Sequence, residues 1–422
     1  MQKLSGKNLL LVGFTLFSMF FGAGNLIFPP HLGAQAGSHL WAAFAGLAVS
    51  AIGLPIAGVV AVARAGGLEP LARRVHPAFA FVFTILVYLS IGPCLAIPRT
   101  ASTSFAMLAP LVGSSPRLQL GYSFLFFTAA FLVALHPEKL TDRLGRILCP
   151  CLILLICILF AGCLLHPPAA HYGAPSDLYA SLPAVQGILY GYQTMDTLAG
   201  LNFGAVIALN IRARGIAQES AVEQGAVRAG FLAGALLLAV YAMLGHAGAL
   251  TGAAVPGLST GADVLTALAG NLFGQAGLVL IAAIFVIACF NTCVGLIACV
   301  GQYFHSLLPR IPYPVLAAFF AGVSILVSNL GLAAIIGLST PVLNALYPIA
   351  IVLILLSYLP GLENRPRIYP LCIFLTALQS IAAALPLGPL SVLANALPFA
   401  EVGFGWVLPA AAGLLLDFLI DR

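Results

Sequence analysis

Charged side chains are scarce in this sequence. Only 7% of the 422 residues are Asp, Glu, Lys or Arg, whereas a soluble domain carries about 25%. The longest polar connections, near 166–181, 212–225 and 249–264, are too short to bury a core of their own. A water-exposed surface cannot be built from this composition, so the sequence excludes a soluble enzyme or a soluble binding domain.

The sequence also lacks metal-ligand residues at the spacing of known metal sites and lacks a recognisable catalytic motif. The nine cysteines all lie in apolar runs without paired spacing, which argues against a disulfide framework or a zinc site. The sequence has neither a His-Glu-x-x-His motif nor a recognisable nucleophile and base, so we expect no enzymatic activity. The net charge of +5 reflects membrane topology, as argued below, and we expect neither a nucleic acid nor an obligate protein partner.

Long apolar runs are abundant, and many reach the length that a helix needs to cross a bilayer. We therefore predict an all-α polytopic membrane protein with about 12 crossings. The lipid bilayer is the solvent for most of the chain. The predicted crossings lie near 8–36, 41–63, 77–112, 118–135, 144–165, 182–211, 226–248, 265–306, 313–333, 335–358, 368–387 and 402–420.

Basic residues favour one orientation of these crossings, because Lys and Arg in short loops are retained in the cytoplasm. With both termini cytoplasmic, only Arg117 falls outside and only Arg99 lies within a crossing. Helices one to five and six to ten have comparable lengths, and an odd repeat of five would be inverted, as in many transporters. We expect one repeat over 1–165, an inverted repeat over 166–358 and two additional C-terminal helices over 359–422.

The first crossing contains a potential break. Gly22-Ala23-Gly24-Asn25 lies near its middle, and Pro29-Pro30 follows one turn later. Glycine permits backbone that is not helical, and unpaired peptide groups are tolerated within a membrane only where they line a cavity or bind a ligand. The alternative is close helix packing through small residues with a proline kink. A secondary transporter is the class that best explains such a break.

The sixth crossing carries a second interruption, with Tyr192, Gln193, Thr194 and Asp196 within a few residues. A polar cluster in the corresponding segment of the second half indicates a transport site. A carboxylate inside a membrane segment is costly and is usually functional or paired, although Asp196 could instead lie at a helix end in water. Gln193 and Thr194 could equally form hydrogen bonds between helices.

Two further polar side chains interrupt apolar segments. Arg99 follows Pro93 and Pro98 in the third crossing, and we consider two interpretations: a gate in which it pairs with Asp196, or an arginine that snorkels to the outer interface. Thr292 in the eighth crossing could donate its hydroxyl oxygen to a cation or bond back to its own helix.

Four motifs resemble the branched-chain amino acid–cation symporter family of bacteria, the BrnQ type. They are Phe21-Gly22-Ala23-Gly24-Asn25-Leu26-Ile27-Phe28-Pro29-Pro30, Gly92-Pro93 with Ala96-Ile97-Pro98-Arg99-Thr100-Ala101, Gly191-Tyr192-Gln193-Thr194-Met195-Asp196-Thr197-Leu198, and Val327-Ser328-Asn329-Leu330-Gly331-Leu332. The resemblance implies uptake of leucine, isoleucine and valine across the bacterial inner membrane. It also implies coupling to sodium ions, with protons as the alternative, and a LeuT-like fold with alternating access and discontinuous helices one and six.

The resemblance also implies a site. The substrate would meet the backbone and side chains of Phe20, Gly22, Ala23, Gly24, Tyr192, Gln193, Thr194 and Asp196. One cation would be bound by Asn25, Thr194 and the Phe20 carbonyl, and a second by the Ser18 and Phe21 carbonyls with Thr292. Cys293 replaces the second hydroxyl usual in the LeuT-like group and is a poor ligand for a hard cation. A symporter of another small solute is the closest alternative, while a channel would need rings of like side chains along a pore.

Overall fold

The computed structural model of the chain describes residues 4–362, 365–385 and 388–420, with side chains as far as Asp417. Within these ranges the protein is helical and contains no strand. Seven helical runs are long and apolar enough to cross a membrane, and two bent helix pairs raise the number to nine. Three shorter apolar helices add to these. The expectation of a multi-pass membrane protein is therefore confirmed, while the figure of about 12 crossings stays a prediction.

The first half of the chain runs through fourteen helical segments, in which η1 and η4 are 3₁₀ turns and η2, η3 and η5 are π-helical. These are α1 (Gly6–Phe20), α2 (Ala23–Ala36), η1 (Gly37–His39), α3 (Leu40–Ala48), η2 (Val49–Gly53), α4 (Leu54–Ala65), α5 (Leu68–Arg73), α6 (Pro77–Leu89), η3 (Ser90–Cys94), α7 (Ala96–Val112), α8 (Pro116–Ala134), η4 (Pro137–Lys139), η5 (Thr141–Leu148) and α9 (Cys149–Leu165).

The second half contains longer helices. They are α10 (Asp177–Ala180), α11 (Pro183–Tyr192), α12 (Asp196–Arg212), α13 (Glu219–Ala254), α14 (Gly261–Phe273), α15 (Gln275–Leu307), α16 (Tyr313–Ser328), α17 (Leu332–Tyr358), α18 (Ile368–Ala384), α19 (Pro389–Asn395) and α20 (Val407–Ile420).

Local sequence explains many of the helix boundaries. Ser5 and Ser115 cap α1 and α8 by accepting hydrogen bonds from backbone N–H groups three residues later, as is usual for serine before a helix. Gly66 adopts the left-handed conformation and ends α4. Gly274 also has a positive φ and separates α14 from α15. The predicted crossing at 265–306 was therefore wrong, because it joined two helices across this glycine.

The two breaks expected from the sequence are present, but each is narrower than predicted. In the first crossing only Phe21 and Gly22 leave helical geometry, and Ala23, Gly24 and Asn25 form the first turn of α2. In the sixth crossing α11 and α12 are bent by 48° across the three residues from Gln193 to Met195.

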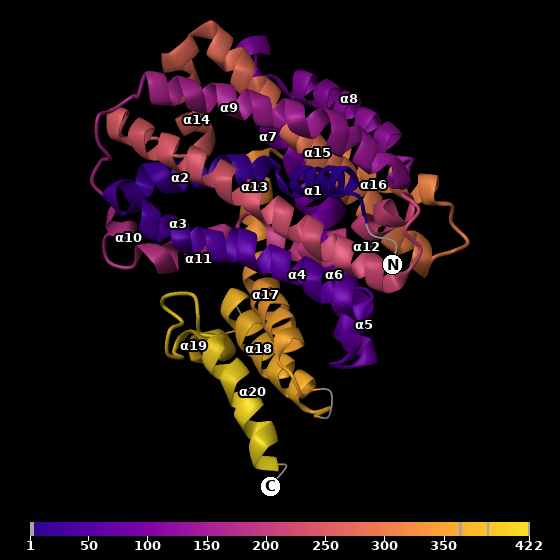
Figure 1. The fold of residues 1–422 in the computed structure, drawn as a ribbon. Helices are drawn as coiled ribbons and strands as arrows, with labels where there is room; N and C mark the ends of the chain where they lie inside the picture. Colours follow the sequence, from indigo (N-terminus) through magenta and orange to yellow (C-terminus); the bar gives the residue numbers. More distant parts are fainter. Residues whose placement is uncertain (1–3, 363–364, 386–387, 421–422) are drawn as a thin grey trace.

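The helices pack as two groups. In the first, α2, α3, α4, α11, α12 and α13 make the most extensive mutual contacts. In the second, α7, α8, α15 and α16 pack against one another, and α1 lies against both α13 and α15. The C-terminal helices stand apart from this body: α18 packs on α17, α20 packs on α18, and all three project from one side of it (Figure 1).

One end of the body collects basic side chains from distant parts of the sequence. Arg214, after α12, donates hydrogen bonds to Asn8 in α1 and to Asp142 in η5. Arg64 at the end of α4 lies over the ring of Tyr358 at the end of α17. These contacts place the ends that the sequence assigns to the cytoplasm near one another, as a shared orientation requires.

Helices α3 and α11 cross with almost no space between their backbones. A Cβ atom added to Gly46 would collide with the carbonyl of Ala184, and one added to Gly187 would collide with the carbonyl of Ala43. Small residues at such crossings allow membrane helices to approach closely, which is the main source of their packing energy.

We predict that Gly46→Val destabilises the protein, because the added methyl groups would force α3 and α11 apart at a cost of about 1–3 kcal/mol. Thermal unfolding of the purified protein in detergent measures this effect. Gly121→Val is the matched control, since no atom lies within 4 Å of a Cβ added there. Equal melting temperatures for the two variants would contradict the close crossing.

Candidate functional site

The two helix breaks form the centre of the site. Phe21 and Gly22 separate α1 from α2, and Met195 opens α12 with a left-handed backbone, φ +67°. This conformation is uncommon for a residue other than glycine and is held only where the surroundings enforce it, often at functional sites. The N-terminus of α2 and the C-terminus of α11 consequently present unpaired peptide groups toward the bundle interior.

Asp196, Asn25 and Tyr241 form a closed hydrogen-bonded triangle that links the breaks. Asn25 Nδ2 donates to Asp196 Oδ2 at 2.5 Å and also to the Tyr241 hydroxyl, which in turn donates to Asp196 Oδ2 at 3.2 Å. Asn25 Oδ1 accepts the N–H of Gly22 at 3.1 Å. Asp196 is only 3% exposed, so the possibility of a carboxylate in water at a helix end is wrong. Hydrogen bonds to a buried charge of this kind are the strong ones.

Arg99 holds the other side of the sixth-crossing break. The α6–α7 segment bends at Gly92 and Pro93, and Arg99 then lies in the first turn of α7. Its guanidinium donates to the carbonyl oxygens of Gln193 at 3.0 Å and Thr194 at 3.3 Å. The side chain is 6% exposed.

The two interpretations of Arg99 from the sequence are both corrected by this geometry. Arg99 does not snorkel to an interface, because it is buried. It also forms no direct ion pair with Asp196 among the described contacts. Arg99 binds the backbone instead because the end of α11 offers carbonyl groups without helical partners, while Asp196 is already held by Asn25 and Tyr241.

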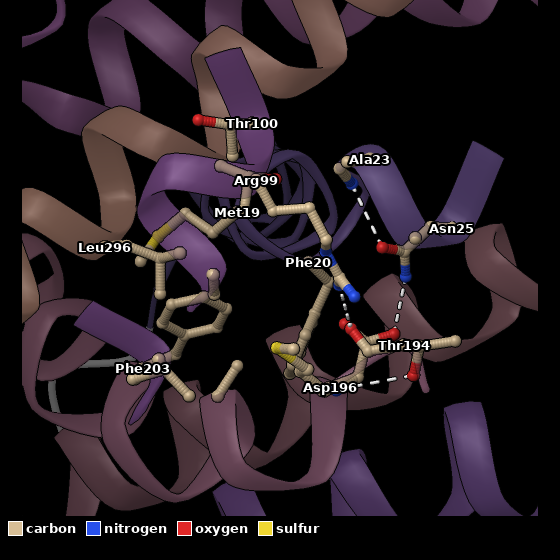
Figure 2. Close-up of a pocket in the computed structure, with 17 residues that line it drawn as sticks. Met19, Phe20, Ala23, Asn25, Arg99, Thr100, Thr194, Asp196, Phe203 and Leu296 are labelled. Carbon is tan, nitrogen blue, oxygen red and sulfur yellow. Dashed lines mark hydrogen bonds between the residues drawn. The ribbon is translucent and has the colours of Figure 1, made fainter. Parts of the chain in front are cut away.

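A small cavity lies between these groups (Figure 2). Its volume of about 20 Å³ leaves room for roughly one water molecule. Its polar wall is formed by Asn25, Arg99, Thr100, Thr194, Asp196 and Thr292. The apolar wall consists of Met19, Phe20, Ile91, Ala96, Met195, Ala199, Phe203 and Leu296.

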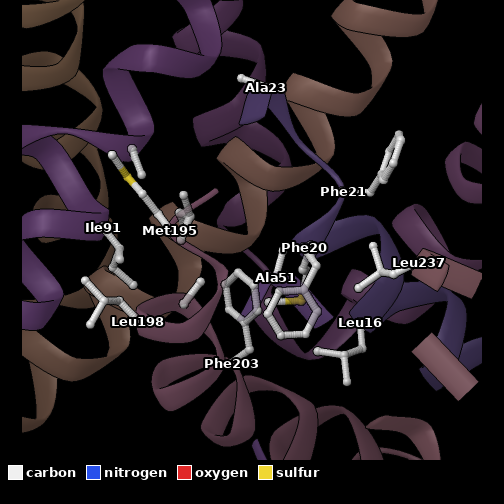
Figure 3. Close-up of a cluster of buried hydrophobic side chains, with 14 of the residues drawn as sticks. Leu16, Phe20, Phe21, Ala23, Ala51, Ile91, Met195, Leu198, Phe203 and Leu237 are labelled. Carbon is white, nitrogen blue, oxygen red and sulfur yellow. The ribbon is translucent and has the colours of Figure 1, made fainter. Parts of the chain in front are cut away.

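Aromatic pairs pack beside the two breaks. Where α1 meets α12, the rings of Phe20 and Phe203 pack edge to face with centroids 5.0 Å apart (Figure 3). Where α2 meets α11, Phe28 packs edge to face on Tyr190 at 5.0 Å, and the Tyr190 hydroxyl bonds to His31 at 2.6 Å. Ring packing therefore joins α1 to α12 and α2 to α11 near the breaks.

Thr292 lies on α15 beside the first break. Its hydroxyl donates to the carbonyl of Ser18 at 3.4 Å, rather than to its own helix, and a Cβ added to Gly22 would meet Thr292 Oγ1 at 2.6 Å. Asn291 donates to Ser18 Oγ at 3.3 Å, and its own Oδ1 is buried without a partner among the described residues. The structure thus brings Ser18 and Thr292 together as expected, with Cys293 buried next to them.

The cavity wall includes most of the residues singled out from the sequence. Those are Phe20, Gly22, Ala23, Gly24, Asn25, Arg99, Thr194, Asp196 and Thr292. Four others are absent from it: Ser18 lies in the last turn of α1 and Phe21 in the break itself, whereas Tyr192 and Gln193 line a separate cavity beside α17 and α18. Sequence reasoning missed Tyr241, Phe203 and Met195. For Tyr241 the signal was a hydroxyl within the apolar stretch of α13 from Ala229 to Gly245.

Comparison with known proteins agrees with this architecture. Residues 5–422 match the family described as branched-chain amino acid transport protein. The chain belongs to this family. It is 40% identical to the branched-chain amino acid transport system 2 carrier protein of Pseudomonas aeruginosa, with 100% of this chain and 98% of that protein covered. It is 38% identical to the branched-chain amino acid permease BraB of Bacillus subtilis, with 98% and 95% covered.

Solved structures at low sequence identity share the fold of this chain. The match to MhsT in complex with L-phenylalanine covers 99% of both chains with a TM-score of 0.58 and 16% identity. A nucleobase-cation-symport-1 family transporter in a closed conformation gives a TM-score of 0.60 at 14% identity, covering 97% of this chain and 91% of that one. These neighbours place the transporter in the LeuT-like fold group, and the expectation that it is not an enzyme is confirmed.

We predict that Tyr241→Phe lowers the stability of the transporter by about 1–3 kcal/mol, because a donor to the buried Asp196 carboxylate is lost. Thermal unfolding of the purified protein measures the loss. Tyr122→Phe is the matched control, since it removes a hydroxyl bonded only to the neutral Ser104. In an Asp196→Asn background the Tyr241→Phe effect should shrink, and an undiminished effect would show that Tyr241 does not act through Asp196.

Proposed function

We propose that this transporter imports leucine, isoleucine and valine by cation-coupled symport with alternating access. One observation carries the proposal: one small cavity is lined by a buried arginine and a buried aspartate that are not paired with each other, and the remaining wall is partly polar and partly apolar. A zwitterion with an aliphatic side chain has the complementary chemistry, because it would satisfy both charges and bury its apolar part.

The substrate carboxylate would bind between Arg99 and the N-terminus of α2. Arg99 lies close to this turn, since a Cβ added to Gly24 would be 3.0 Å from Arg99 Nη2. The first turn of a helix carries N–H groups without intrahelical partners, and its dipole favours an anion. The guanidinium has five N–H donors, so donors remain after its two bonds to the backbone carbonyls.

The substrate amine and side chain would occupy the opposite wall. Asp196 and the carbonyl groups at the end of α1 provide acceptors for an ammonium group. The rings of Phe20 and Phe203 with Leu296 surround the remaining space. Since the cavity is much smaller than an amino acid, these side chains must move apart when the substrate enters.

The coupling ion would bind at the same breaks. We assign sodium to Asn25, Thr194 and the Phe20 carbonyl, and a second ion to the Ser18 and Phe21 carbonyls with Thr292. Oxygen ligands suit a hard cation, and the Asn25 oxygen retains a second lone pair beside its bond to Gly22. Protonation of Asp196 is the alternative form of coupling. Because ion and substrate organise the same segments, each would raise the affinity for the other.

Alternating access would follow from the two helix groups. The group containing α2, α3, α4, α11, α12 and α13 would move with α1 against the scaffold of α7, α8, α15 and α16. The Phe20–Phe203 pair would then open toward the cytoplasm, and the Phe28–Tyr190 pair toward the outside. The clustered basic ends support cytoplasmic termini, and we assign the transporter to the bacterial inner membrane.

Uptake of labelled leucine into proteoliposomes tests symport directly. We expect accumulation when an inward sodium gradient alone is imposed, with valine and isoleucine competing and alanine or lysine competing poorly. Accumulation driven by a proton gradient alone would show that the coupling ion is a proton and not sodium. Equilibration without accumulation under either gradient would rule out symport.

We predict that Arg99→Gln removes most of the preference for leucine over leucinamide, which lacks the carboxylate charge. Loss of a hydrogen bond to a charged group corresponds to about a tenfold to hundredfold weaker leucine binding. Leucinamide should bind both proteins with similar affinity, which also shows that the variant is folded. Arg117→Gln at the start of α8, outside the cavity wall, is the control, and an unchanged preference in Arg99→Gln would contradict the carboxylate site.

A further inference from the structure

A second, larger cavity lies at the basic end of the helices. Its volume is about 470 Å³, and its described wall comes from the ends of α4 and α17, from Arg74 just after α5, and from the segment before α18. Three arginines contribute to it, Arg64, Arg74 and Arg365, and the described lining contains no carboxylate. The positive charge of these described residues favours an anionic ligand.

Two of these arginines are held in place by tyrosines and form no ion pair within the part of the chain that the structure describes. The Arg64 guanidinium lies 5.5 Å from the centre of the Tyr358 ring, and the Tyr358 hydroxyl donates to the carbonyl of Ala57. The Arg74 guanidinium lies 5.8 Å from the Tyr369 ring and donates to its hydroxyl at 3.0 Å. Among the described residues neither guanidinium meets a carboxylate, so both keep N–H donors for a ligand.

Arg365 differs from these two, because it already donates to Asp417 at 3.1 Å. The anion would therefore be bound mainly by Arg64 and Arg74. Stacking on tyrosine fixes the planes of the guanidinium groups, which lowers the entropy lost when they bind a phosphate through paired N–H donors.

The position of the cavity identifies the source of the anion. Two apolar runs end here, one at Ala65 and one at Tyr358, and another begins at Pro77. The cavity is therefore level with the membrane–water boundary, and both Arg64 and Arg74 are exposed. At this depth the abundant phosphate anions are phospholipid headgroups, and basic pockets between helices on the cytoplasmic side are suited to them.

We propose that this cavity binds the phosphodiester headgroup of an anionic phospholipid, with Arg64 and Arg74 as its ligands. The lipid would join α4 and the α5 segment to α17 and α18, and so tie the C-terminal helices to the body. This inference does not depend on the identity of the transported solute.

Native mass spectrometry of the full-length protein in detergent tests the site with phosphatidylglycerol as the probe and phosphatidylcholine as the uncharged comparison. We expect one preferential phosphatidylglycerol site, and an Arg64→Gln/Arg74→Gln variant should bind it about thirtyfold more weakly, as expected for two arginines near an anionic headgroup. Arg146→Gln/Arg310→Gln removes the same charge away from the cavity and should bind as the unmodified protein does.

Three results would overturn the proposal. These are equal losses in both double variants, unchanged binding in the Arg64→Gln/Arg74→Gln variant, and full displacement of the lipid by millimolar inorganic phosphate, which would indicate a soluble anion. If the glutamine variant does not fold, Arg64→Lys/Arg74→Lys replaces it. Lysine keeps the charge but lacks the planar pair of donors, so a several-fold weaker site is expected, and an unchanged affinity would count against guanidinium ligands.

Discussion

The burial of the Asp196 carboxylate is the constraint on which the rest of the structure depends. A charge in an apolar bundle is costly unless hydrogen bonds replace its hydration. Asn25 from α2 and Tyr241 from α13 supply those bonds, and Asp196 itself begins α12. Three helices that are distant in sequence are thereby fixed around one oxygen atom. The two broken crossings are consequently coupled to each other and to an unbroken helix.

This coupling explains how opposite charges are kept apart in one small cavity. Asp196 accepts hydrogen bonds from Asn25 and Tyr241. Arg99 donates hydrogen bonds to the carbonyl groups of Gln193 and Thr194, in the break. Each charge has enough partners to be stable when buried, yet neither neutralises the other. If Asp196 and Arg99 bonded directly to each other, neither charge would be left for a ligand. Under the proposed symport, the separate charges would bind the two ends of a zwitterion, and a ligand or ion that changes one break would affect the other.

Outside the site, small residues and aromatic pairs determine which parts can move. Gly46 and Gly187 let α3 and α11 pack at backbone contact, so these two helices behave as one unit. The Phe20–Phe203 and Phe28–Tyr190 contacts consist of ring packing. The Tyr190 hydroxyl adds one hydrogen bond, to His31. In the proposed alternating-access cycle, these contacts would open in turn while the hydrogen-bonded centre stays intact.

Much of this protein could be predicted from its sequence alone. Low charge and long apolar runs define a multi-pass membrane protein, and the glycines before Asn25 and the polar residues before Asp196 locate both breaks to within a few residues. Such properties are local, because they depend on the composition and order of neighbouring residues. Only the tertiary structure assigned partners: Tyr241 bonds to Asp196, and Arg99 bonds to the backbone between α11 and α12 rather than to a carboxylate. A buried polar group bonds to whichever helix packs beside it, and that choice is made by the fold.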